Sequence, residues 1–168
     1  MDVRPVTADE WPRWRETRVR MLREESASFS SRWEDVARQP DAYWQEWVGA
    51  AAEGLTRRLF VAEDGGGWIG AVGCHLRVDP AETQLISMWV EPAARRRGVA
   101  QALIRAVAEW ARERGCHRVF LFVQEANTSA RRLYESAGFR ATGEREELPT
   151  RRGFKIPMWA PVEQLLGQ

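Results

Sequence analysis

The feature that most constrains the fold is the segment of residues 90–103, which passes from an apolar strand through a basic turn into a helix. Pro92 lacks a backbone N–H and therefore ends the strand, while Gly98 allows the backbone to turn closely. Apolar side chains then recur at helical spacing from Val99 to Trp110. Because the first turn of a helix has N–H groups without partners and a partial positive charge, the segment predicts a site for an anion such as a diphosphate.

The residues that follow extend this segment into a βαβ unit. Gly115 ends the predicted helix, and residues 118–123 form a continuous apolar run, which is typical of a strand covered on both faces. Short connections join strand, helix and strand. The strand that ends at Val90 and the strand at residues 118–123 should therefore be parallel neighbours joined by a right-handed crossover.

The rest of the chain predicts helices before this unit and antiparallel strands around it. Asp64-Gly65-Gly66-Gly67 is composed of residue types that tolerate positive φ, so it predicts a β-hairpin between the apolar segments on either side. In chain order we also expect a strand at residues 2–6, a helix after Thr7, a loop at 24–31, a helical region broken near Pro40 and ending at Gly54, a short helix from Asn127 to Ser136, and a closing antiparallel pair at 139–148 and 155–159.

Length and composition place the chain among ordinary globular proteins. With 168 residues, of which 44% are hydrophobic and 29% charged, we expect residues 1–168 to form a single domain that needs no disulfide or metal. No apolar run is long enough to span a membrane, and the amino terminus lacks a signal-like segment, so we expect a cytoplasmic protein. Cys74 and Cys116 lack CxxC spacing, and we expect two buried thiols rather than a metal site.

Charge and residue usage restrict the partners. A net charge of +1 argues against a protein that coats nucleic acid. The basic residues are arginine except for Lys155, and alanine is abundant, which indicates a GC-rich bacterial genome.

Two motifs resemble those of a known family. Residues 95–100, Arg-Arg-Arg-Gly-Val-Ala, are similar to the acetyl-CoA signature Gln/Arg-x-x-Gly-x-Gly/Ala of the GNAT family of N-acetyltransferases. Residues 127–139, Asn-x-x-Ala-x-x-Leu-Tyr-x-x-x-Gly-Phe, resemble the second motif of that family, and the resemblance covers roughly residues 83–143. It implies an α/β (α+β) domain with a twisted, mostly antiparallel sheet, one parallel βαβ pair and helices on both faces. It also implies an enzyme that moves an acetyl group from acetyl-CoA to a primary amine.

The resemblance also implies a set of residues that hold acetyl-CoA. Pantetheine is expected in a gap that a bulge opens beside Met88, Trp89 and Val90. Of the three arginines in the turn, Arg96 or Arg97 is expected to contact a phosphate, because the planar guanidinium donates two parallel hydrogen bonds. The full expected set comprises Met88, Trp89, Val90, Arg95, Arg96, Arg97, Gly98, Val99, Ala100, Gln101, Asn127 and Ala130.

Acyl transfer from a thioester to an amine moves two protons, and the resemblance gives a candidate for one of them. Tyr134 matches the family tyrosine that donates to the departing thiolate. Gln84 stands where some members carry a glutamate base, and Glu82 lies on the same strand face two residues earlier. The second proton is the one that the amine must lose. Either a water chain passes it to Glu82, Glu24 or Glu25, or the amine arrives already deprotonated.

The resemblance implies that the acceptor site is formed by the loop after the first helix and by the last hairpin. Glu24, Glu25, Phe29 and Trp33 are the candidate substrate-binding residues, and the tryptophans of this region either line the site or pack onto the sheet. Glu24 and Glu25 favour a cationic amine, whereas Arg151 and Arg152 favour an acidic group, so the acceptor, a small molecule or a peptide amine, stays open. We expect neither metal nor membrane, and a monomer or homodimer. The alternative function is a regulatory module that binds acetyl-CoA without turnover.

Overall fold

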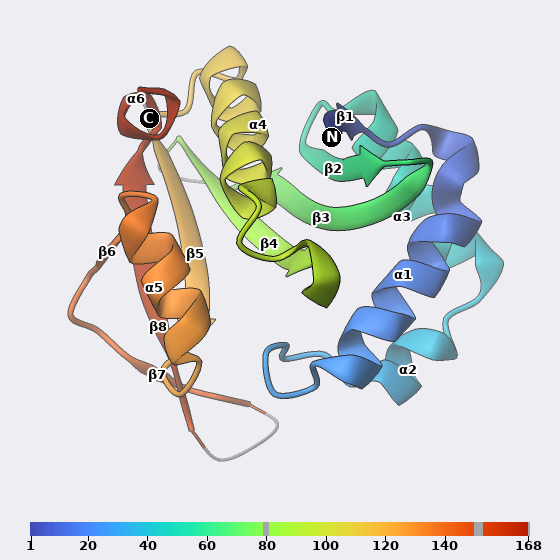
Figure 1. Ribbon diagram of the computed structural model, residues 1–168, viewed down its shortest axis with the longest axis horizontal. Coiled ribbons are helices and arrows are strands. Elements are labelled where there is room, and N and C mark those ends of the chain that lie inside the picture. The colour runs from blue at the N-terminus through green and yellow to red at the C-terminus, as the bar shows by residue number, and fades with distance from the viewer. Residues whose placement is uncertain (79–80, 150–152, 168) are drawn as a thin grey trace.

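Among the residues that the computed structural model describes, 1–78, 81–149 and 153–167, one mixed sheet of eight strands lies between helices (Figure 1). Arg151 and Arg152, which bear on the acceptor, lie outside the described residues. The strands are β1 (Asp2–Pro5), β2 (Arg57–Asp64), β3 (Gly67–Leu76), β4 (Glu82–Val90), β5 (Arg118–Gln124), β6 (Arg140–Ala141), β7 (Glu146–Glu147) and β8 (Phe154–Pro161).

The order of the strands places the βαβ unit at the centre of the sheet. The order is β1-β2-β3-β4-β5-β8-β6, with β7 also paired to β8. The pair β4–β5 is parallel, and the other recorded pairs of described strands are antiparallel. The expected mostly antiparallel sheet with a parallel βαβ pair is therefore confirmed.

Helices cover both faces of the sheet. They are α1 (Trp11–Glu24), α2 (Trp33–Ala37), α3 (Asp41–Glu53), α4 (Val99–Glu113), α5 (Thr128–Ser136) and α6 (Val162–Leu166), with 3-10 turns at Ala8–Glu10 and Pro92–Ala94. Successive residues of β2 belong to different cores: Phe60 packs in the core that contains α4 and α5, and Leu59 packs in the core that contains α1 and α3. This alternation follows from the two-residue period of a strand.

A close approach of backbone to helix fixes where α4 begins. Gly70 in β3 has no side chain, and a Cβ atom there would lie 2.8 Å from Cγ1 of Val99 and 3.0 Å from Cδ1 of Leu103. Both residues belong to the first turns of α4. The glycine therefore lets the start of the helix, and the turn before it, lie directly on the sheet.

The C-terminal part differs from the expected pair of strands. The segment predicted as one strand at residues 139–148 contains only the two-residue strands β6 and β7. Between them Gly143 has φ of +90°, a left-handed conformation that a regular strand does not accommodate, so the ladder is interrupted there. The helix α6, which the sequence did not predict, follows β8 and packs against α4.

Most of the N-terminal tryptophans pack rather than line a site. Trp14 and Trp44 are buried in the second core, and Trp47 stacks on Trp14 with ring centres 5.9 Å apart. Among the described residues, no helix is both long and apolar enough to cross a membrane.

Candidate active site

A bulge in β4 shapes the site. Ala71 of β3 is opposite Trp89, but Gly73, two residues further on, is opposite Ile86, so β4 holds one extra residue between them. Ser87, inside this bulge, has φ of +55°, which is unusual for a residue with a side chain. The expected bulge is present, beginning one residue before the predicted Met88.

Beyond the bulge, β4 and β5 separate. Their parallel pairing covers only residues 82–84 of β4 and 118–120 of β5. Figure 1 shows the two strands diverging from that end, with α4 starting above β4 and α5 lying beside β5. The edge of β4 that faces β5 is therefore left without ladder partners from Leu85 onward, and its backbone groups are available to a ligand.

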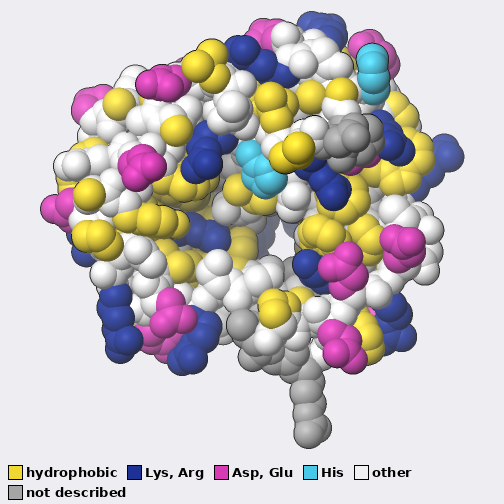
Figure 2. Space-filling model, turned by 180° about the vertical axis from the view of Figure 1, so that it is seen from behind, with side chains coloured by type: hydrophobic (Ala, Val, Ile, Leu, Met, Phe, Trp, Pro, Cys, Tyr) yellow, Lys and Arg dark blue, Asp and Glu magenta, His cyan; other side chains and the backbone are white. Residues whose placement is uncertain are grey.

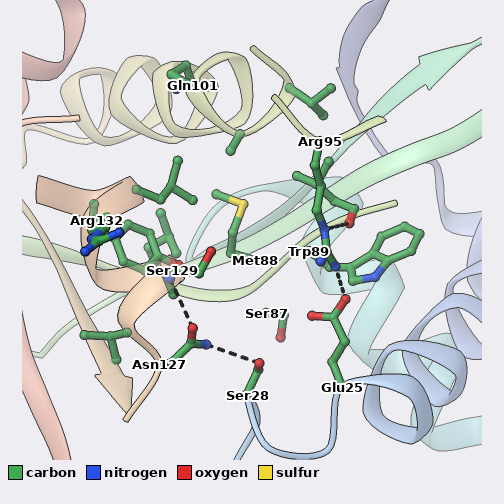
Figure 3. Close-up of a pocket in the computed structure, with 18 of the residues that line it drawn as sticks. Glu25, Ser28, Ser87, Met88, Trp89, Arg95, Gln101, Asn127, Ser129 and Arg132 are labelled. Carbon is green, nitrogen blue, oxygen red and sulfur yellow. Dashed lines mark hydrogen bonds and ion pairs between the residues drawn. The ribbon is translucent and has the colours of Figure 1, made fainter. Parts of the chain in front are cut away.

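A cavity of about 650 Å³ lies in this gap. Its wall includes Leu85–Val90 of β4, the end of β5, the start of α4 and one face of α5. The loop after α1 closes one side through Glu25, Ser28 and Phe29 (Figure 3). From behind, Figure 2 shows a hollow in the middle of the molecule with hydrophobic and basic side chains around it.

The turn before α4 has the geometry of an anion site. Gly98 and Arg96 both adopt the left-handed region, with φ of +81° and +63°. Such a turn directs successive N–H groups to one side, and the N–H groups of the first turn of α4 have no intrahelical partners. Arg96, Gly98, Val99, Ala100 and Gln101, all expected to bind acetyl-CoA, line the cavity.

The three arginines of the turn have different environments. Arg95 donates from Nε to the carbonyl oxygen of Val90 and from Nη2 to the carboxylate of Glu25. Arg97 pairs with Asp64 at 3.0 Å and is not part of the cavity wall. Arg96 lines the cavity and forms no ion pair with a described carboxylate, which makes it the arginine of this run that is free to contact a phosphate.

One further cation at the cavity was missed in the sequence. Arg132 of α5 lines it and has no ion pair among the described residues. Ser129, Arg132, Leu133 and Ser136 recur at helical spacing along the wall, and that spacing is the signal that could have identified them. The bulge residue Ser87 was also missed, as were Phe122 and Gln124 at the end of β5.

Tyr134 lies in the cavity wall with only 7% of its surface exposed. Its ring packs edge-on against Phe139 with centres 5.6 Å apart, which fixes its orientation. Burial disfavours the charged phenolate and raises the pKa of Tyr134 above its usual value. The hydroxyl is consequently a proton donor at neutral pH.

Asn127 connects two walls of the cavity. Its carbonyl oxygen accepts a hydrogen bond of 3.1 Å from the N–H of Ala130, which caps α5. Its amide nitrogen donates to the hydroxyl of Ser28 in the loop after α1, at 3.2 Å (Figure 3). Both Asn127 and Ala130, which were expected to bind acetyl-CoA, line the cavity.

The structure does not bring the candidate base Glu82 to the cavity. Glu82 starts β4, at the end where β4 and β5 are still paired, and only the part of the strand from Leu85 lines the cavity. Its carboxylate pairs with Arg118 at 2.8 Å and with Arg77 at 3.6 Å. Strand alternation predicts on which face of β4 the Glu82 side chain lies. It does not predict whether that part of the strand borders the gap between β4 and β5.

The four candidate acceptor residues divide into two groups. Glu25 and Phe29 line the cavity, whereas Glu24 and Trp33 do not. Glu24 pairs with Arg20 at 3.0 Å, and the ring of Trp33 lies 4.7 Å from the guanidinium carbon of Arg23. Within the described part of the chain, no group of three or more His, Cys, Asp or Glu side chains is placed to hold a metal ion.

Comparisons with known proteins agree with this geometry. Residues 18–139 match the Acetyltransferase (GNAT) family. The chain is 37% identical over 90 residues to N-acetyltransferase 8 of Homo sapiens, which covers 51% of this chain but only 40% of the human protein. The chain thus spans less than half the length of that relative.

Solved structures share the fold. An acetyltransferase from Salmonella typhimurium, yncA, determined with its cofactor acetyl-CoA, superposes with a TM-score of 0.78 at 18% identity, covering 96% of this chain and 94% of that one. A GCN5-related N-acetyltransferase from Kribbella flavida gives a TM-score of 0.74 at 26% identity, covering 95% and 96% of the two chains.

The family match covers both the anion-binding turn and the Asn127–Phe139 segment, and with it most of the cavity wall. On this match, the chain belongs to the GNAT family of acetyltransferases.

Proposed function

We propose that this chain is an N-acetyltransferase that moves the acetyl group of acetyl-CoA directly to a primary amine while both substrates are bound. The observation that carries the proposal is that a single cavity joins an anion-binding turn, an unpaired strand edge and a tyrosine hydroxyl. The acceptor is a small molecule or a peptide amine.

The wall of the cavity fits the parts of acetyl-CoA. The N–H groups at the start of α4, with Arg96 and Arg132, would hold the phosphates. The amides of pantetheine would pair with the free edge of β4 as an added peptide strand does, beside Met88, Trp89 and Val90. Ala130, at the facing start of α5, is small enough to leave room for this chain.

When bound, acetyl-CoA supplies the acetyl group and a thiol leaving group. The amine nitrogen forms a bond to the acetyl carbon as the carbon–sulfur bond breaks, so the nitrogen loses one proton and the sulfur gains one. Tyr134 stays protonated because burial raises its pKa, and its hydroxyl donates to the departing sulfur. The phenolate that remains regains a proton from the water that receives the proton of the amine.

The proton of the amine has no dedicated acceptor in this proposal. Among the described residues that line the cavity, Glu25 carries the only carboxylate, and Arg95 already occupies it. The acceptor therefore enters as the free amine, and its proton leaves to water after the new bond forms.

The test is a panel of amines assayed for release of free thiol from acetyl-CoA, with the acetylated product identified by mass spectrometry. Polyamines, aminoglycosides, amino acids and peptides with a free N-terminus cover the main acceptor classes. We expect thiol release that depends on the amine and matches the amount of acetylated product. Binding of acetyl-CoA without turnover across the whole panel would instead support the regulatory module, which the lack of a free cavity carboxylate keeps as the second candidate.

A further inference from the structure

Arg18 occupies a position where an arginine is not expected. It lies in α1 on the helix face that also carries Trp14, Met21 and Leu22, one turn before and after it. These three neighbours are almost completely buried, with 3%, 0% and 0% of their surfaces exposed. The guanidinium group therefore reaches into the interior between α1 and the loop that follows it.

The charge of Arg18 is not compensated. Its Nη1 atom is buried without a hydrogen-bond partner, and among the described carboxylates none pairs with it. Burial lowers its pKa to about 10, so the group is still charged at neutral pH. Other arginines of α1 have partners: Arg13 pairs with Glu63 and Arg15 with Asp41.

Arg18 lies behind the wall that the loop after α1 gives to the cavity. Its guanidinium carbon is 5.1 Å from the ring centre of Phe29. Phe29 lines the cavity together with Glu25 and Ser28 of the same loop. The Phe29 ring therefore adjoins both the guanidinium and the cavity.

The acidic residues of the loop do not offset this charge. The carboxylate of Glu24 is taken by Arg20, and that of Glu25 by Arg95. A cationic acceptor such as a polyamine would find no free carboxylate on this wall, whereas an anionic group would find an unpaired guanidinium. A buried charge without a partner costs stability, and such a cost is retained where a ligand supplies the missing partner.

We propose that Arg18 recognises an anionic group on the acceptor, so that the preferred acceptors are amines that also carry a carboxylate or a phosphate. This inference rests on the proposed function. A guanidinium binds either group through two parallel hydrogen bonds, and Phe29 holds it in place by stacking.

The test compares acceptors that differ only in the anion: leucine with leucinamide, and O-phosphoethanolamine with ethanolamine. The variants are Arg18→Gln, which removes the charge, and Arg18→Lys, which keeps the charge but not the planar fork. Arg15→Gln, on the exposed side of the same helix, is the matched control. Differences in the pKa and intrinsic reactivity of the two amines cancel when the kcat/KM ratio of a variant is divided by that of the parent, because both enzymes are assayed with the same pair.

We expect the kcat/KM ratio of the anionic to the neutral acceptor to fall about tenfold to a hundredfold from the parent to Arg18→Gln in one of the two pairs, mainly through KM. An effect in the leucine pair would indicate recognition of a carboxylate, and an effect in the ethanolamine pair would indicate recognition of a phosphate. Affinity for acetyl-CoA, measured by calorimetry, should stay that of the parent.

Thermal unfolding gives a second readout. Replacing Arg18 by Met keeps the bulk and removes an uncompensated charge, so the variant should be as stable as the parent or more stable. A purely structural arginine would give a clear loss. Turnover with a kcat/KM ratio that Arg18→Gln leaves unchanged in both pairs would overturn the inference while the acetyltransferase function stands. Absence of turnover with every amine would overturn both.

Discussion

The side-chain amide of Asn127 donates a hydrogen bond of 3.2 Å to the hydroxyl of Ser28 and so ties the start of α5 to the loop after α1. Glu25 of the same loop is bonded to Arg95 on the other side of the cavity. The loop is thus bonded to the start of α5 on one side of the cavity and to the turn before α4 on the other. We expect its position, and hence the acceptor site, to depend on these two contacts.

Replacing Ser28 or Asn127 by alanine should separate the loop contact from the helix cap. Asn127→Ala removes both and should lower the free energy of unfolding by about 1 kcal/mol, the usual value of a helix N-cap. Ser28→Ala removes only the contact with the loop and should leave stability within about 0.5 kcal/mol of the parent. Both should raise KM for the acceptor, and the double variant should raise it no further than Asn127→Ala alone. Additive effects on KM would show that the hydrogen bond does not position the loop.

Tyr134→Phe removes the hydroxyl and keeps the ring that packs on Phe139. If the hydroxyl donates to the departing sulfur, kcat should fall by about 10²- to 10⁴-fold while acetyl-CoA affinity and melting temperature stay close to those of the parent. The comparison is made under single-turnover conditions, because slow product release would hide the loss. Rates within about twofold of the parent would exclude Tyr134 as the donor.

The pH dependence of kcat/KM should reflect the pKa of the acceptor amine and not the titration of a group on the enzyme. Because the single carboxylate among the described cavity residues is bonded to Arg95, kcat/KM should rise with pH up to the pKa of the free amine. Burial raises the pKa of Tyr134, so its donor form persists and no loss is expected up to about pH 10. Two acceptors with different amine pKa values are measured. A rise at the same pH for both acceptors would reveal an enzyme base and contradict this account.

Glu82→Gln should affect stability and spare the chemistry. Glu82 is 7% exposed and its carboxylate pairs with Arg118 and Arg77, so the substitution removes the carboxylate with which those two charges pair. We expect the free energy of unfolding to fall by about 1 to 3 kcal/mol, between the values for surface and buried pairs. The kcat with a good acceptor should remain within about twofold. A folded variant with kcat reduced tenfold or more would show that Glu82 takes part in the reaction.

The local and periodic features of the fold could be predicted from the sequence. The βαβ unit, the anion-binding turn and the Asn127 cap were predicted because each depends on residues close together in the chain. The interruption at Gly143 and the helix α6 were not predicted, because glycine is compatible with several turn types and a five-residue helix has too little periodicity.

The candidate active site could be predicted from the sequence less completely than the fold. Strand alternation placed Glu82 on a face, but where the strands separate depends on pairing across the sheet, which no local pattern encodes. Likewise Arg96 and Arg97 are equivalent in the sequence, and only the positive φ of Arg96 and the pairing of Arg97 with Asp64 distinguish them. Arg18 stands at helical spacing among buried hydrophobic residues, but the sequence does not show whether a carboxylate lies near it. That its Nη1 atom has no hydrogen-bond partner among the described residues is seen only in the structure.

Binding of acetyl-CoA at the start of α4 is the central claim, and Gly98 allows a controlled test. Gly98 precedes this helix and Gly115 follows it. Both have positive φ, +81° and +73°, and a Cβ atom on either would meet no other atom within 4 Å.

The measurement is calorimetric titration of acetyl-CoA into the parent, Gly98→Trp and Gly115→Trp. Both substitutions strain the backbone alike, by roughly 1 kcal/mol, and should lower the melting temperature to a similar extent. The account predicts that Gly98→Trp loses affinity at least tenfold, because the indole blocks the approach of the diphosphate, while Gly115→Trp binds as the parent does. Parent-like affinity in a folded Gly98→Trp, or an equal loss in both variants, would contradict it.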